Sequence, residues 1–118
     1  MAKAITLSFI YLFLVHFDTH ACDTTKIIAH RGVSSLAPQN TLPAFQLGID
    51  LNVDYIELDV QQSSDDSLIV IHDATVNATT SHSGFVNSYS YNDLKLMDAG
   101  SWFSSDYADF AGRLHRTR

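Results

Sequence analysis

Ionisable side chains stand in or directly after three apolar runs of this sequence, and their types suit metal and phosphate chemistry. In chain order, the members of this set are His30, Arg31, Glu57, Asp59 and His72. An α/β enzyme presents its reactive groups where its strands end, at the open edge of the sheet. The positions of these residues therefore predict a catalytic site built on strand ends.

Two carboxylates, Glu57 and Asp59, lie two residues apart in one of these runs. On a strand they project from the same face, about 6.6–7 Å apart at Cα, and repel each other unless a cation neutralises them. With no cysteine or His-x-x-His neighbour, the pair suits a hard divalent cation, Ca²⁺ or Mg²⁺, better than zinc. An acidic pair is also typical of a solvated face, but the apolar opposite face (Ile56, Leu58 and Val60) favours the ligand pair.

The histidine–arginine pair at His30 and Arg31 suits a phosphate ester. Imidazole moves protons near neutral pH, guanidinium holds two phosphate oxygens at once, and Gly32 lets the backbone approach closely. His72, followed by Asp73, is the second candidate acid or base. Each motif alone is compatible with a loop start or a strand-end histidine. Together with the acidic pair, they are the components needed to cleave a phosphodiester.

The apolar runs predict three strands, at 26–29, 54–60 and 68–72. Because side chains alternate along a strand, the set that carries the ionisable groups would face the mouth of a barrel, and the aliphatic set would pack outward.

The polar segment 61–67 is too short for a parallel crossover, so a hairpin is predicted. A turn centred between Asp65 and Asp66 would place Asp59 directly opposite His72, about 5 Å away between Cα atoms.

Helical spacing predicts a helix from about 41 to 51, capped by Asn40 or Thr41, with Pro43 in its first turn. The residues of its apolar face are Leu42, Phe45, Gly48 and Ile49. Residues 74–90 are predicted to form a long exposed loop, 91–97 a short helix, and Trp102 and Phe103 part of the core.

Length and composition set limits on the class of protein. The 118 residues suffice for one domain, and 46% hydrophobic with 17% charged residues is typical of a globular protein. The net charge of −6 argues against a nucleic-acid partner. The sequence gives no indication of oligomeric state.

Residues 1–21 are predicted to be a secretory signal peptide, with Lys3, an apolar stretch at 4–15, and Ala21 as the last residue before cleavage. The apolar stretch is shorter than the ~20 residues that cross a bilayer, so no stable membrane anchor is expected. The mature protein would be secreted or periplasmic. Cys22, the only cysteine, allows no internal disulfide; lipid anchoring there is a weaker alternative, because no leucine precedes it as such sites favour.

From about residue 26 to 110, the chain resembles the glycerophosphodiester phosphodiesterase family. The matching stretches are His30-Arg31-Gly32, Pro38-Gln39-Asn40-Thr41, Ala44-Phe45, Gly48, Asp54-Tyr55-Ile56-Glu57-Leu58-Asp59-Val60, Val70-Ile71-His72-Asp73, Thr79-Thr80 and Trp102-Phe103. The resemblance implies an α/β fold, the N-terminal portion of a (β/α)₈ TIM barrel, over a domain at 22–118. It also implies metal-dependent hydrolysis of a small glycerophosphodiester to glycerol 3-phosphate and an alcohol.

The resemblance also implies roles for the candidate residues. His30 and His72 would be the acid/base pair, Arg31 would bind phosphate, and Glu57 and Asp59 would hold the divalent cation. Gln39 departs from the family, which usually has glutamate there, and Ala78 stands where an arginine is frequent.

The family continues with further strands and a third metal carboxylate, whereas this chain offers ~97 residues after the leader against ~250 for a barrel. We therefore expect a barrel truncated after roughly three strands, with little or no activity of its own. The alternatives are a non-enzymatic fragment or pseudogene product, and another metal-assisted barrel phosphodiesterase resembling phosphatidylinositol phospholipase C or sphingomyelinase D.

Overall fold

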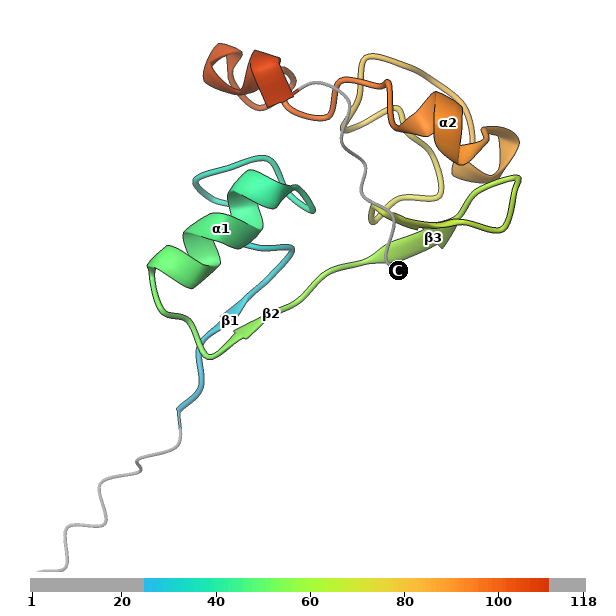
Figure 1. Ribbon diagram of the computed structural model, residues 1–118. Helices are drawn as coiled ribbons and strands as arrows, with labels where there is room; N and C mark the ends of the chain where they lie inside the picture. Colours follow the sequence, from blue (N-terminus) through green and yellow to red (C-terminus); the bar gives the residue numbers. More distant parts are fainter. Residues whose placement is uncertain (1–24, 111–118) are drawn as a thin grey trace, which may run out of the picture.

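The computed structural model describes residues 25–110, so the predicted leader 1–21 and Cys22 lie outside the described residues. The elements, in chain order, are β1 (Ile28–Ala29), α1 (Leu42–Asp50), β2 (Tyr55–Ile56), β3 (Val60–Gln62), β4 (Leu68–Val70), the 3₁₀ turn η1 (Val86–Ser88), α2 (Tyr91–Leu94) and the 3₁₀ turn η2 (Ser105–Phe110). Figure 1 shows α1 beside the β1–β2 pair, and α2 above the strand β3.

The strands β1 and β2 pair in parallel, with Ile28 opposite Tyr55 and Ala29 opposite Ile56. An ion pair of 2.8 Å between Lys26 Nζ and Asp54 Oδ1 closes the start of the pair. Because the strands are parallel, the residues that follow them, 30–32 and 57–59, meet at the same edge.

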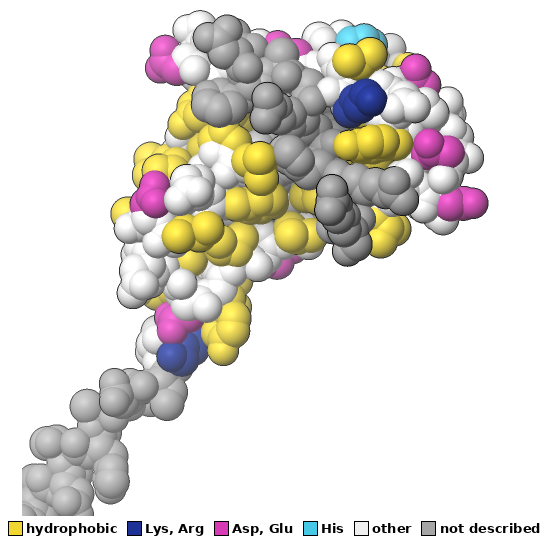
Figure 2. Space-filling model, in the orientation of Figure 1, with side chains coloured by type: hydrophobic (Ala, Val, Ile, Leu, Met, Phe, Trp, Pro, Cys, Tyr) yellow, Lys and Arg dark blue, Asp and Glu magenta, His cyan; other side chains and the backbone are white. Residues whose placement is uncertain are grey.

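The helix α1 begins where it was predicted, with Thr41 as N-cap and proline in its first turn. Its predicted apolar face is wrong in part, because Leu42 and Ile49 are 47% and 63% exposed. The buried residues are small: Ala44 lies against Gly32, and Gly48 lies against Ile56 of β2. The small residues bring the helix close to the sheet and leave the larger side chains exposed. Figure 2 shows apolar side chains gathered over this part of the molecule.

The strand predicted at 54–60 is two strands, β2 and β3, separated by residues 57–59. The backbone of this segment changes partners: Glu57 N–H donates to Ala29 O at 2.9 Å, whereas Asp59 O accepts from Ile71 N–H at 3.0 Å. The segment therefore leaves the sheet of β1 and joins that of β4, which a single straight strand cannot do.

The strands β3 and β4 form the predicted antiparallel hairpin, with Val60 opposite Val70 and Gln61 opposite Ile69. The predicted register is wrong by one residue, because the turn is centred on Asp65 rather than between Asp65 and Asp66. Continued along the chain, this register puts Ile71, not His72, opposite Asp59.

The largest apolar cluster lies between β4, η1 and α2. Its buried members are Ile69, Ile71, Val76, Val86, Leu94, Met97 and Ala99. The segment 74–90 is therefore not a wholly exposed loop, since Val76 and Val86 are fully buried in this cluster. A helix is present where one was predicted at 91–97, but α2 ends at Leu94, and a capping box formed by Ser90 and Asp93 begins it.

The predicted core aromatics lie at the margin. Trp102 is 43% exposed and packs edge-on against the half-buried Phe103, with ring centroids 5.7 Å apart. Within residues 25–110, no helix has the length and apolar character needed to cross a membrane.

Candidate active site

Arg31, Glu57 and Asp59 meet at the edge where β1 and β2 end. The Arg31 backbone N–H donates to Glu57 Oε2 at 2.8 Å, and Arg31 Nε lies 3.2 Å from Asp59 Oδ2. The Nε atom is buried and, within the described chain, has no hydrogen bond of good geometry. This nitrogen faces Asp59, so an incoming anion would reach the guanidinium through its other nitrogens.

Two amide side chains hold this cluster. Gln39 Oε1 accepts from Arg31 Nη1 at 2.8 Å, and Asn40 Nδ2 donates to Asp59 Oδ2 at 3.0 Å. Asn40 Oδ1 also accepts from the Asp59 backbone N–H at 3.1 Å. Asn40 therefore does not cap α1 with its side chain, because that side chain is turned to the carboxylate.

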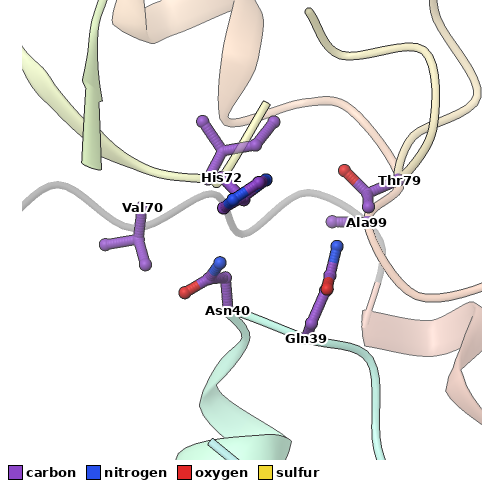
Figure 3. Close-up of a pocket in the computed structure, with 7 residues that line it drawn as sticks. Gln39, Asn40, Val70, His72, Thr79 and Ala99 are labelled. Carbon is purple, nitrogen blue, oxygen red and sulfur yellow. The ribbon is translucent and has the colours of Figure 1, made fainter. Parts of the chain in front are cut away.

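His72 lines a pocket beside these amides. Figure 3 shows its ring above Asn40, with Gln39 and Thr79 reaching toward the same hollow. The ring Nδ1 lies 2.7 Å from Asp73 Oδ1, so the ring is oriented through one nitrogen and Nε2 is left for a ligand. The hollow has an empty volume of about 220 Å³ including its open mouth, less than the ~300 Å³ at which small-molecule sites begin.

His30 is exposed and does not line this pocket. It precedes Arg31 in the turn after β1, but the described chain shows no hydrogen bond of its ring. The structure thus brings Arg31, Glu57 and Asp59 together, places His72 next to them across Gln39 and Asn40, and leaves His30 at the rim.

The acidic pair fits a hard cation as a partial ligand set. One oxygen of each carboxylate, Glu57 Oε2 and Asp59 Oδ2, is bound by a donor, and the other makes no hydrogen bond within residues 25–110. The described residues hold no group of three or more potential ligands. Mg²⁺ commonly takes one or two protein carboxylates, and completes its shell with water and substrate phosphate.

The carboxylates whose pKa is lowered lie in the scaffold, not in the site. Lys26 lowers the pKa of Asp54 by hydrogen bonding, the Ser63 hydroxyl lowers that of Asp65, and the Ser101 hydroxyl lowers that of Asp98. These groups fix the start of β2, the hairpin turn and the turn after Met97.

Gln39 and Asn40 were not assigned to the site from the sequence, although both lie in a stretch that matches the family and Gln39 was noted as departing from it. Neutral amides do no acid–base chemistry, so their types did not indicate a site role, and Asn40 was considered only as one of two possible helix caps. The available indication of a role in the site was their position in the loop between Pro38 and the first residues of α1.

Solved structures share this fold. A glycerophosphodiester phosphodiesterase from Agrobacterium tumefaciens is 40% identical, with a TM-score of 0.74 covering 79% of this chain and 39% of that one. An Oleispira antarctica phosphodiesterase, in complex with the product sn-glycerol-3-phosphate, is 36% identical, with a TM-score of 0.69 covering 71% and 34%. The described fold is therefore part of the α/β barrel of phosphodiesterases.

Sequence relatives agree with the structures. YhdW of Bacillus subtilis (strain 168) is 52% identical over 77 residues, or 65% of this chain and 32% of YhdW. A Caldanaerobacter subterraneus glycerophosphodiester phosphodiesterase is 46% identical over 84 residues, or 71% and 35%. Residues 30–111 match the model of the glycerophosphoryl diester phosphodiesterase family, and the chain belongs to that family. It spans about a third of the length of these curated relatives.

Proposed function

We propose that this site serves the divalent-cation-dependent hydrolysis of glycerophosphodiesters to glycerol 3-phosphate and an alcohol. The observation that carries the proposal is the cluster of Arg31, Glu57 and Asp59, in which each carboxylate keeps one oxygen for a ligand beside a guanidinium group. Membership of the family supports the reaction class. The product complex of the Oleispira relative supports the substrate class.

Each residue has a role in the proposal. Glu57 and Asp59 would hold Ca²⁺ or Mg²⁺, which would draw charge from the phosphate oxygens. Arg31 binds two further phosphate oxygens. His30 and His72 divide the proton transfers, one removing a proton from the attacking oxygen and the other supplying one to the leaving oxygen. The Asp73 carboxylate keeps the His72 ring oriented for this transfer.

The proposal extends to location and to the isolated chain. The residues at 1–21 support export and cleavage after Ala21, to a secreted or periplasmic protein. We expect little turnover from the isolated chain, because its described part gives two carboxylates to the cation and leaves both imidazoles exposed to water.

A chimera separates the competence of the site from that of the isolated chain. Residues 30–110 replace the matching segment of the Caldanaerobacter phosphodiesterase, and glycerol 3-phosphate release from glycerophosphocholine is measured with Mg²⁺ or Ca²⁺. We expect cation-dependent turnover that is abolished by chelation and by Glu57→Gln. A folded chimera that binds cation but releases no product would refute the proposed hydrolysis.

A further inference from the structure

We propose that Asn40 is a positioning residue for the cation site, whose side chain orients the Asp59 carboxylate and leaves Oδ1 to the metal. This inference rests on the proposed function, in which Glu57 and Asp59 hold a divalent cation.

The contact between Asn40 and Asp59 has two points. Asn40 Nδ2 donates to the carboxylate oxygen Oδ2 at 3.0 Å, and Asn40 Oδ1 accepts from the Asp59 backbone N–H at 3.1 Å. One bond fixes the Asn40 amide to the Asp59 backbone and the other reaches the Asp59 carboxylate, so the amide bridges the two and restrains where the carboxylate lies. Asn40 is only 4% exposed, so little water competes for these bonds.

The backbone of Asn40 is fixed independently of its side chain. Its φ of 58° lies in the left-handed region, which asparagine adopts more readily than most residues. Its N–H donates to Arg31 O at 2.9 Å, which joins the two ends of the loop 31–40. The Arg31 N–H in turn holds Glu57. One loop therefore orients both carboxylates, Glu57 through a backbone bond and Asp59 through a side chain that mutation can remove.

Groups that orient metal ligands contribute to affinity without touching the metal. Removing the Asn40 amide should therefore weaken cation binding while Glu57 and Asp59 both remain. A purely structural role would instead change stability and leave the affinity of the folded protein unchanged.

The first measurement needs no variant. Mg²⁺ is titrated into the ¹⁵N-labelled full chain, and side-chain amide signals are followed by NMR. The Asn40 signal should shift, because its Nδ2 shares the Asp59 carboxylate with the ion. The Gln46 amide also donates to a carboxylate, that of Asp50 on the exposed face of α1, and should not move.

The second measurement compares Asn40→Gly with Asn52→Gly by calorimetric titration of Mg²⁺. Both positions have left-handed backbones, with φ of 58° and 53°, so glycine is tolerated at each. Asn52 is exposed at the end of α1, and its side chain makes no hydrogen bond within the described residues. We expect Asn40→Gly to weaken Mg²⁺ binding about 10- to 100-fold, and Asn52→Gly to leave it unchanged.

The outcomes distinguish this inference from the function on which it rests. If Asn40→Gly binds Mg²⁺ as the unmodified chain does, or if the Asn40 amide signal stays fixed during saturation, the positioning role is wrong while cation binding stands. If the unmodified chain binds no Mg²⁺ and Glu57→Gln makes no difference, both the cation site and the role of Asn40 are wrong.

Discussion

The reactive side chains of the site other than His30 are anchored by hydrogen bonds or ion pairs that leave further atoms for chemistry. Glu57 and Asp59 are each held by a single oxygen, and His72 is held by Nδ1 against Asp73. Arg31 is held by Nη1 against Gln39 and by Nε against Asp59. Such anchoring lowers the entropy lost when a ligand binds, because the side chains are already oriented.

At the residue scale, Arg31→Lys tests the binding of phosphate by the Arg31 guanidinium. Lysine keeps the charge but loses the planar fork that binds two oxygens, and with it the bond to Gln39. We expect the affinity of the chimera for glycerol 3-phosphate to fall about 10-fold, or ~1.4 kcal/mol, in a calorimetric titration. Lys95→Arg, at an exposed hydrogen bond to Asn92 near the end of α2, is the control in the same chimera and should change nothing. Equal affinities in Arg31→Lys and the parent would exclude a two-oxygen contact.

A second residue-scale prediction concerns acid stability. The Ser101 hydroxyl and the N–H groups of Ser101 and Gly100 lower the pKa of Asp98 below its ordinary value of 3.8. A lowered pKa in the folded state means that the unfolded chain takes up the proton first. This stability is therefore present above pH 3.8 and is lost as the pH falls through the folded value.

Urea midpoints measured from pH 7 down to pH 3 test this prediction. The wild type should lose stability below pH 3.8, and Asp98→Asn should lose less over the same interval. Ser101→Ala removes the largest cause of the shift and should flatten the curve in the same direction. Parallel curves for all three proteins would show that Asp98 does not contribute.

At the element scale, the features that depend on residues close together in the sequence were the ones that the sequence predicted. The start of α1 followed from Pro43, and a short helix was predicted where α2 begins, although its capping box of Ser90 and Asp93 was not. The hairpin followed from the polar segment 61–67, but its register depended on the turn conformation, including the left-handed backbone of Asp66 at φ 61°. Composition alone does not determine which turn conformation forms, and so does not determine the register of the hairpin.

The parts that sequence could not predict depend on distant partners. The break at 57–59 follows from pairing first with β1 and then with β4, and the burial of Val76 and Val86 follows from packing against α2. The same limit applied to the site: charge and type identified Arg31 and the acidic pair, but not the amides that orient them.

Gly32 follows the site residue Arg31 and packs against Ala44 of α1, so a substitution there tests the contact between the site and this helix. Its φ is 76°, and a Cβ there would lie 2.7 Å from Ala44 backbone and side-chain carbons. We expect Gly32→Ala to lower the free energy of unfolding by at least about 1–3 kcal/mol, measured by urea denaturation. Gly48→Ala is the matched control: the three atoms nearest its Cβ would be side-chain carbons, two of Ile56 at 3.0 and 3.1 Å and one of Val53 at 3.5 Å. The gain in helix propensity, about 1 kcal/mol, offsets these contacts. Equal effects of the two changes would refute the tight contact at Gly32.

At the scale of the whole molecule, the site and the main apolar cluster share a strand. Ile69 and Ile71 enter the cluster, and Val70, Ile71 and His72 line the pocket. Ile71, the residue after β4, thus belongs to both and connects the packing of the molecule to the position of the neighbouring imidazole. Loss of core packing should therefore reach the pocket through β4.

Two leucines near the end of α2 allow a matched test of this connection. Leu94 is fully buried in the cluster, whereas Leu96 is 74% exposed. We expect Leu94→Ala to cost about 2–5 kcal/mol of unfolding free energy, and Leu96→Ala to stay within about 0.5 kcal/mol of the parent. In NMR spectra recorded below the unfolding transition, Leu94→Ala should also shift the His72 ring signals. Equal costs for the two leucines, or an unmoved His72 in a destabilised Leu94→Ala, would show that this cluster does not support the site.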